Sequence, residues 1–227
     1  MIHAIAPEAA IRVILFTPSA LAHTASLVAV LAETVRAGTS SGDVISISAA
    51  VGEHCLTRAQ AASLHSALQA AARRHVTVVA GTGDIGPVAE PCTIQIPPAG
   101  FSPVRGVSLP ASDPLVLAAG GTSLDASHRT GAYISETAWG LPYGDPGTEF
   151  QASGGGFSQL YPRPAYQNGV PAIGANRGVP DVSADASGHT GMALVVSEGA
   201  GQYTIVNSGG TSAAAPFWAG LIAPDRP

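Results

Sequence analysis

The sequence predicts an α/β fold in which a parallel sheet carries helices on both faces. Two observations lead to this prediction. In the first half of the chain, short apolar runs that suit buried strands alternate with longer segments whose apolar residues recur at helical spacing. In the second half, glycine-rich loops and short strands replace this alternation, and loops of that length usually carry function. Strand, helix and strand in succession imply right-handed crossovers and therefore parallel pairing.

The N-terminal segment offers two interpretations. Arg12 precedes an apolar run and residues 20–22 resemble a signal-peptidase site, but Pro7 and Glu8 interrupt the basic start that a signal peptide needs. We therefore expect no export signal in this chain. Residues 11–16 are predicted to form the first buried strand instead.

A helix is expected from about Thr24, with leucines and valines on one face, to Gly38, which ends it. Residues 44–48 (V-I-S-I-S) form the next predicted strand. Thr57 and Gln60 then make a capping box that opens a second helix.

Two more buried strands are predicted at residues 76–80 (V-T-V-V-A) and 115–119 (L-V-L-A-A). Further on, residues 192–196 and 202–206 have the pattern of a hairpin. The glycine-rich loops between these elements are expected to shape a cleft beside the sheet.

The segment Ser208–Ala219 is predicted to be a glycine turn that opens into an apolar helix, with Ser212 in the first turn. A hydroxyl there faces unpaired backbone N–H groups and the positive end of the helix dipole, which stabilise charge that develops beside it. An ordinary capped helix would explain G-T-S alone. The following A-A-A-P makes the segment resemble the nucleophile region of subtilisin-like serine peptidases.

A second candidate lies in the loop G-T-G-D-I-G, which includes Asp84 and follows the third predicted strand. Open α/β sheets place their sites at this end of parallel strands. A phosphate-binding loop is a weak alternative, because Pro87 follows where a helix would be needed. Taken alone, Asp84 also suits an Asx turn.

The chain is expected to be one domain over residues 1–227. Apolar residues make up 46%, which is ample for a core, and no repeat or linker divides the sequence. Only 11% of the residues are charged and the net charge is −5, which argues against nucleic acid or an anionic membrane as a partner. No apolar run reaches the roughly 18 residues of a membrane span.

Four ordered segments together resemble the sedolisins, a family of serine-carboxyl peptidases with a subtilisin-like fold. The first is A-G-T-G-D-I-G around Asp84, which is similar to the family's A-x-x-G-D-S-G. The others are P-A-S-D-P-L-V-L-A-A-G-G-T from Pro110, G-G-G-F-S-Q-L-Y-P-R-P-A-Y-Q from Gly154 and R-G-V-P-D-V-S-A-D-A from Arg177. The resemblance extends over nearly the whole chain.

The resemblance implies that Ser212 is the nucleophile and that Asp84 is the acid that stabilises the oxyanion. It also implies substrate-binding positions at Ser48, Gly155, Gly210 and Thr211. A carboxyl group donates a hydrogen bond to an oxyanion only while it is protonated, so we expect acidic operation on polypeptide substrates. Asp84 and Ser212 should then face one gap, with the carboxyl group within about 6–7 Å of the hydroxyl. An Asp84 turned into a cap would rule the site out.

The general base of the family, a Glu with an Asp four residues later, has no match, because no Glu in the chain is followed by Asp at that spacing. The segment from Ala4 resembles the family strand that follows the helix with those acids. We therefore expect a chain shortened at both ends. No metal is expected in this chain, whereas Ca²⁺, an extracellular location and a monomeric state are expected of the full-length parent.

The remaining acids and histidines are not assigned catalytic roles. Glu53, Asp181 and Asp185 match family positions, and turn or packing roles are favoured for both aspartates. Ala49 stands where the family commonly has Trp. This chain therefore lacks the large side chain that is expected to form one wall of the substrate cleft. The histidines lack the subtilisin context and are expected at surfaces or helix ends. An inactive peptide-binding module and an ordinary subtilisin remain the alternatives.

Cys55 and Cys92 supply only two of the four ligands of a structural zinc site and do not form C-x-x-C. A disulfide or two buried thiols remain. Both cysteines follow the ends of neighbouring predicted strands, and export of the parent would supply an oxidising compartment, so we predict a disulfide.

Overall fold

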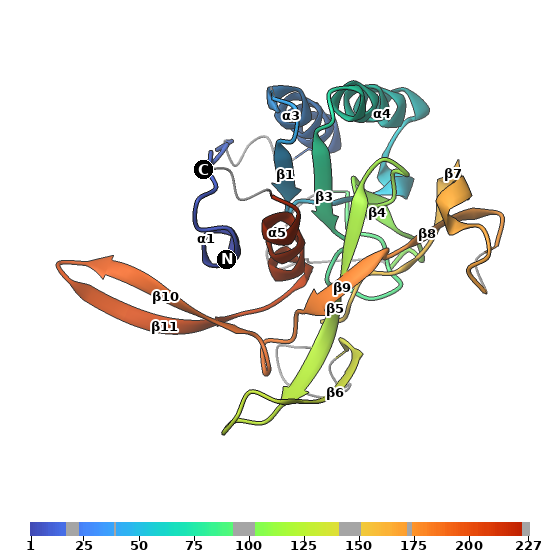
Figure 1. Cartoon of the computed structure of the whole chain (residues 1–227). Helices are drawn as coiled ribbons and strands as arrows, with labels where there is room; N and C mark the ends of the chain where they lie inside the picture. Colours follow the sequence, from blue (N-terminus) through green and yellow to red (C-terminus); the bar gives the residue numbers. More distant parts are fainter. Residues whose placement is uncertain (17–22, 39, 93–102, 141–150, 172–173, 224–227) are drawn as a thin grey trace.

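The computed structural model describes residues 1–16, 23–38, 40–92, 103–140, 151–171 and 174–223 of the chain (Figure 1). At its centre, strand β5 (Leu117–Ala126) has neighbours on both edges. Strands β1 (Val44–Ile47) and β3 (Thr77–Gly81) extend the sheet in parallel from one edge, and β9 (Val182–Asp185) pairs in parallel with the other. Strand β6 (Tyr133–Ala138) runs antiparallel to the second half of β5. The predicted parallel sheet is confirmed, with one antiparallel strand added.

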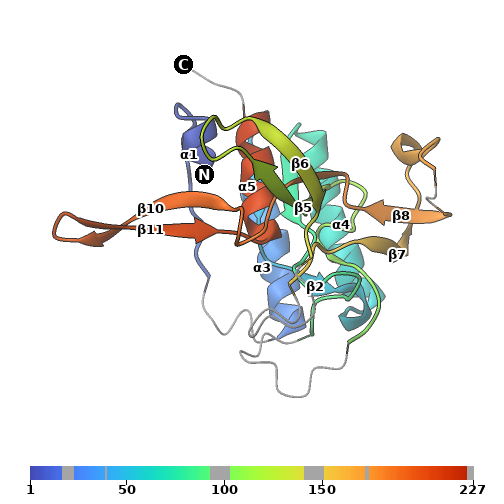
Figure 2. The same cartoon turned by 90° about the horizontal axis from the view of Figure 1, so that it is seen from below.

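Helices cover both faces of this sheet, as the sequence predicts. Helices α3 (Thr24–Ala37) and α4 (Arg58–Arg73) pack together on one face, and α5 (Thr211–Ile222) lies against the other (Figures 1 and 2). Successive side chains of strand β3 point to opposite faces of the sheet, so β3 contributes to both cores. Val78 belongs to the core under α3 and α4, and Val79 belongs to the core under α5.

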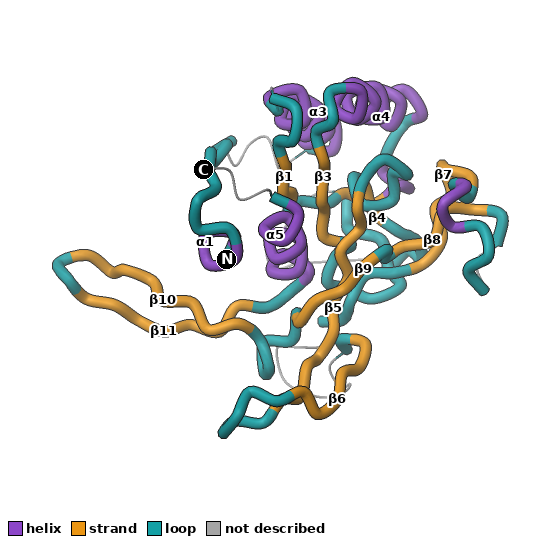
Figure 3. The backbone as a smooth tube through the Cα atoms, in the orientation of Figure 1, coloured by secondary structure: helices purple, strands orange, loops and turns teal. Residues whose placement is uncertain are grey.

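Shorter elements surround the sheet. Helix α1 (Ile2–Ile5) lies beside α5, the 3₁₀ turn η1 (Glu53–Cys55) precedes α4, and η2 (Ala165–Gln167) follows β7. The short strand pairs are β2 (Val51–Gly52) with β4 (Ser108–Leu109), and β7 (Gly156–Pro162) with β8 (Asn176–Val179). The hairpin β10 (Met192–Gly199) with β11 (Gln202–Ser208) extends away from the sheet as two long strands joined by a tight turn (Figure 3).

Several local predictions are confirmed. The capping box is present, with Thr57 Oγ1 accepting from Gln60 N at 3.3 Å and Thr57 N donating to Gln60 Oε1 at 2.8 Å. The predicted hairpin forms, and its two strands extend to residues 199 and 208, with Leu194 opposite Val206. A disulfide joins Cys55 and Cys92, whose Cα atoms are 5.2 Å apart.

The strand predicted at residues 11–16 is wrong. These residues belong to no helix or strand, and all six side chains are exposed, including Leu15 at 87%. A lone extended segment gains no ladder hydrogen bonds, and none of the described residues pairs with this one. Apolar composition alone therefore does not make a strand.

The fourth predicted strand is real but longer than expected. It continues through Gly120 and Gly121 to Ala126 instead of ending at residue 119. The glycines permit this, because a Cβ on Gly120 would lie 2.7 Å from Pro180 and one on Gly121 would lie 2.6 Å from Ala186. Glycine here marks close packing within the sheet.

In the described part of the chain, no helix combines the length and apolar character that crossing a membrane requires.

Candidate active site

The N-terminus of α5 exposes Ser212 between buried neighbours. Gly210 precedes the helix with φ +79°, a backbone conformation that suits glycine. Thr211 and Ala213 are 2% and 1% exposed, whereas Ser212 is exposed to solvent. The successive residues of a helix point in different directions, so the serine faces outward while both neighbours pack inward.

Strands β1 and β3 hold this helix end at close range. A Cβ on Gly81, at the end of β3, would lie 2.9 Å from the backbone oxygen of Thr211, so only glycine allows this approach. Gly83 N donates to Thr211 Oγ1 at 3.1 Å, and Ser48 Oγ donates to the backbone oxygen of Ser212 at 3.2 Å. The loops that follow two parallel strands therefore both contact the first turn of α5.

Asp84 reaches the same helix end. Its Oδ1 accepts hydrogen bonds from Thr211 N and Thr211 Oγ1, both at 2.8 Å. Its Oδ2 lies 2.7 Å from the position that a Cβ on Gly210 would take. Asp84 thus contacts the residue directly before Ser212.

One expectation about Asp84 is wrong, because its carboxyl group does cap a helix. The first N–H groups of α5 lack intrahelical acceptors and lie at the positive end of the helix dipole, so they bind the nearest carboxyl oxygen. The capped helix is the one that carries Ser212. Only Oδ1 takes part, and no described residue donates to Oδ2.

The glycine-rich run at residues 153–155 lies against the Asp84 loop. Gly154 N donates to Gly83 O at 2.8 Å, and a Cβ on Gly154 would lie 2.2 Å from Thr82 O. Gly155 lines an open hollow beside β5 and β6, together with Thr137 and Ser183 among others. Of the six residues predicted for the site, five lie around the start of α5, and Gly155 lines the hollow beside β5 and β6.

Glu90 is a neighbour of the site that sequence reasoning missed. Its Oε1 accepts from Asp84 N at 3.2 Å. A Cβ on Gly83, which has φ +104°, would lie 2.8 Å from the same oxygen. Burial raises the pKa of Glu90, and the charge of Asp84 raises it further, while the bond from Asp84 N lowers it. No spacing rule signals this contact, because the chain returns to Asp84 through an irregular loop.

Asp181 and Asp185 have the structural roles expected of them, and Glu53 has one as well. Glu53, which is 6% exposed, accepts from Ser158 Oγ at 2.6 Å and so joins η1 to β7. Asp181 pairs with the fully buried Arg177 at 2.5 Å. Asp185 accepts from Thr190 Oγ1 at 2.8 Å within a turn.

His65 departs from the expectation for histidines. It lies in the middle of α4, and its Nδ1 is 2.7 Å from Oδ2 of Asp113, which is completely buried. A buried carboxyl group requires such a partner. Helix α4 covers the face of the sheet opposite α5, so this pair does not belong to the Ser212 site.

Calcium binding stays an expectation for the full-length parent. Calcium takes six to eight oxygen ligands. Within the described ranges, the one group of three or more metal-capable side chains is His54, Cys55 and Cys92, which offers nitrogen and sulfur.

Comparison with known proteins gives consistent matches. The chain is 34% identical to kumamolisin from Bacillus sp. (strain MN-32), over 97% of this chain and 37% of that protein. It is 41% identical to sedolisin from Pseudomonas sp. (strain 101), over 52% of this chain and 19% of that protein. No protein-family model matches.

Among solved structures, the fold is similar to that of Pseudomonas sedolisin, a serine-carboxyl proteinase complexed with two molecules of pseudo-iodotyrostatin. The TM-score is 0.67 at 28% identity, over 87% of this chain and 50% of that chain. The chain thus spans half or less of the length of each of these relatives.

Proposed function

This chain belongs to the sedolisin family of serine-carboxyl peptidases, and we propose that it forms part of a serine-type endopeptidase that hydrolyses polypeptides at acidic pH. Ser212 is the nucleophile, and Asp84 stabilises the oxyanion. One observation carries the proposal: exposed Ser212 stands in the first turn of α5, and Asp84 bonds to the residue directly before it.

The chemistry follows from this arrangement. Ser212 Oγ attacks the carbonyl carbon of the substrate, its proton passes to a general base, and the carbonyl oxygen becomes an oxyanion. Oδ1 of Asp84 is held by Thr211, so a proton on Oδ2 is the one available for a hydrogen bond to that oxyanion. A carboxyl group stays protonated only with a raised pKa or in an acidic medium, and the proposal specifies acidic pH.

Substrate binding is assigned to the residues around this helix end. Gly210 and Gly155 leave room for a peptide backbone, since neither carries a side chain. Ser48 and Thr211 fix the backbone of the first turn of α5 through their hydroxyl groups. Polypeptides are the proposed substrates, and for the longer parent we propose an extracellular monomer that binds Ca²⁺ outside these 227 residues.

A second candidate is a peptide-binding module without activity. Two observations favour it: no Glu in these 227 residues has an Asp four residues later, and Asp84 already caps α5. The two candidates share the same peptide substrates, and they differ in whether a base reaches Ser212.

The first experiment compares the 227-residue chain with a longer chain that includes an E-x-x-x-D segment upstream, both assayed on a denatured protein between pH 3 and pH 8. We expect no measurable cleavage by the short chain, because loss of general-base catalysis alone costs about 10²–10⁴ in rate. Cleavage by the long chain that Ser212→Ala abolishes supports the peptidase. A long chain that binds peptides but never cleaves them supports the binding module.

The second experiment tests Asp84 in the active long chain. Asp84→Ala should lower turnover about 10²–10³-fold, the usual cost of an oxyanion donor. Asp84→Asn retains a donor that needs no acid, so its activity should extend to higher pH than that of the unmodified protein. Asp125→Asn, at an exposed position on β5, is the matched control. An unchanged rate for Asp84→Ala would remove Asp84 from the mechanism.

A further inference from the structure

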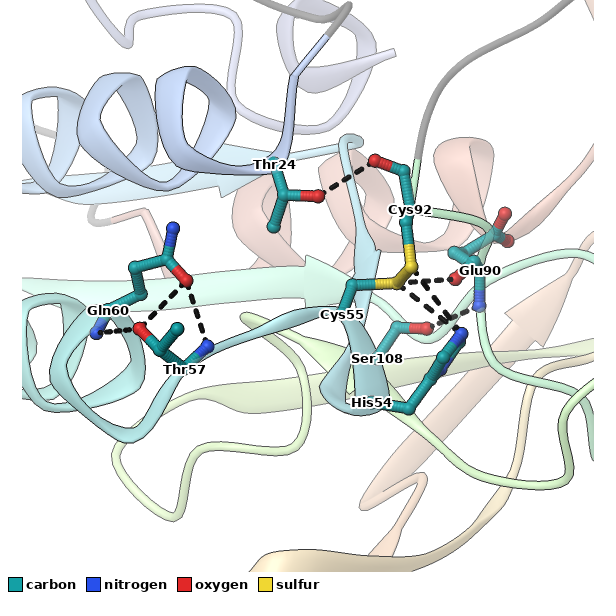
Figure 4. The surroundings of a disulfide bond; sticks show 8 residues. All are labelled: Thr24, His54, Cys55, Thr57, Gln60, Glu90, Cys92 and Ser108. Carbon is teal, nitrogen blue, oxygen red and sulfur yellow. Dashed lines mark hydrogen bonds between the residues drawn. A yellow bond between two sulfur atoms is a disulfide. The ribbon is translucent and has the colours of Figure 1, made fainter.

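A histidine lies against the disulfide on the side of η1. His54 Nε2 is 3.4 Å from Cys55 Sγ and 3.6 Å from Cys92 Sγ (Figure 4). His54 and Cys92 are exposed, and Cys55 is half-buried. The three side chains therefore converge on one point at the surface of the protein.

These separations match a tetrahedral zinc site. With Zn–S near 2.3 Å and Zn–N near 2.05 Å, tetrahedral angles place a ligand nitrogen about 3.6 Å from each ligand sulfur. The two sulfurs would stand about 3.8 Å apart, further than in any disulfide. The imidazole is thus already in position, and only the sulfur–sulfur bond excludes a metal.

Backbone contacts other than the disulfide hold this arrangement. Gly52 N donates to Glu90 O at 3.1 Å, and Thr24 Oγ1 donates to Cys92 O at 2.7 Å. A Cβ on Gly52 would lie 2.7 Å from His54 Nδ1, so glycine at this position allows the ring to fold back. The two Cα atoms, 5.2 Å apart, can therefore stay close when the sulfurs separate.

We propose that, after reduction of the disulfide, His54, Cys55 and Cys92 bind a thiophilic divalent cation such as Zn²⁺. A dithiol or a phosphine in water donates two electrons and is oxidised to its disulfide or its phosphine oxide, while the sulfurs gain two protons as thiols. The metal then displaces those protons and binds both thiolates and His54 Nε2. A solvent molecule takes the fourth position, because the site faces water.

This site is compatible with the sequence but is not visible in it. In the sequence, two cysteines that are far apart supply only two of the four ligands of a structural zinc site. The fold adds His54 as a third ligand, and three protein ligands with one open position are sufficient for zinc. The metal would replace a covalent link with a reversible one at the end of the loop that carries Asp84. The inference does not depend on peptidase activity.

The test uses the whole chain, reduced with a phosphine that does not bind metals strongly, and Co²⁺ as a spectroscopic probe for Zn²⁺. We expect one Co²⁺ per chain, with the thiolate charge-transfer and intense visible bands of a tetrahedral site, and their loss when Zn²⁺ is added. The oxidised chain should show neither band.

Two variants make the test specific. His54→Ala should weaken Co²⁺ binding at least about tenfold, the smaller of the losses seen even for residues that support a metal ligand indirectly. His128→Ala, an exposed histidine in another loop, should change nothing. Equal affinity in the unmodified chain and His54→Ala would overturn the proposal, and so would the absence of cobalt bands.

Discussion

The two faces of the sheet are packed by different means. Under α3 and α4 most of the buried core residues are Leu, Ile or Val, among them Leu31, Leu64 and Leu68, each at most 2% exposed. Under α5 the fully buried residues are mostly alanines, such as Ala214 and Ala215, with Val79 as the larger exception. Large side chains keep a helix away from a sheet, and small ones let the two backbones meet.

The α5 face carries the proposed active site, and its small residues bring Asp84 to the helix end that holds Ser212. Gly81 brings β3 against the backbone of Thr211, and Asp84 follows three residues later to bond the same residue. A longer side chain at Gly81 would move Ser212 away from Asp84. The α3 and α4 face stabilises the fold, and the α5 face sets distances in the site.

The largest expected effect on stability comes from the face with large side chains. Leu64→Ala removes a completely buried side chain and should lower the free energy of unfolding by about 2–5 kcal/mol. Denaturant unfolding of the whole chain measures this. Leu221→Ala, whose side chain on α5 is 53% exposed, is the matched control and should cost far less. Equal losses of unfolding free energy at the two leucines would contradict the stabilising role assigned to the α3 and α4 face.

Substitution of Gly81 is expected to lower stability less than Leu64→Ala does, but to lower turnover. Gly81→Ala places a methyl group 2.9 Å from the backbone of Thr211, which should cost about 1–3 kcal/mol as overpacking and displace Ser212. In the active long chain, turnover should fall with little change in fold. Gly38→Ala is the control, because its nearest neighbours are the movable ends of Ile45 and Val76. Normal turnover in Gly81→Ala would show that the close approach is not needed.

The smallest expected effect concerns the pH dependence of stability. The raised pKa of Glu90 means that the folded protein holds its proton more tightly than the unfolded chain. Stability is then fully present below the unfolded pKa, near 4.5, and falls as pH rises through the folded value. Glu90→Gln keeps an acceptor for Asp84 N and removes this loss, so it should be more stable than the unmodified chain at neutral pH and equal to it in acid. A constant difference at every pH would contradict the assignment.

The first half of the fold could be predicted because its signals are local. The capping box at Thr57 and the apolar runs at β1 and β3 act within a few residues, and each predicted element forms. Residues 11–16 show the limit of this reasoning, because a strand needs a partner that composition does not reveal. The extension of β5 through Gly120 depends on Pro180, a contact between segments distant in sequence.

The site was predictable in part. Ser212 and Asp84 stand in short motifs whose residue types reflect chemistry, and the structure brings both to one helix end. The bond from Asp84 N to Glu90 and the position of His54 over the disulfide depend on irregular loops. Such loops have no periodicity, so a sequence gives no rule for which side chains they bring together.

The bond between Cys55 and Cys92 closes a covalent ring, because the two residues are 37 positions apart and α4, β3 and Asp84 all lie between them. A single nick in the backbone inside that ring leaves both pieces attached through sulfur, whereas a nick elsewhere in the chain yields two separate fragments. Recovery of the native fold after a nick inside the ring is therefore a unimolecular reaction whose rate does not depend on protein concentration. The segment with Asp84 therefore stays attached to the rest of the protein after a single cut between the two cysteines.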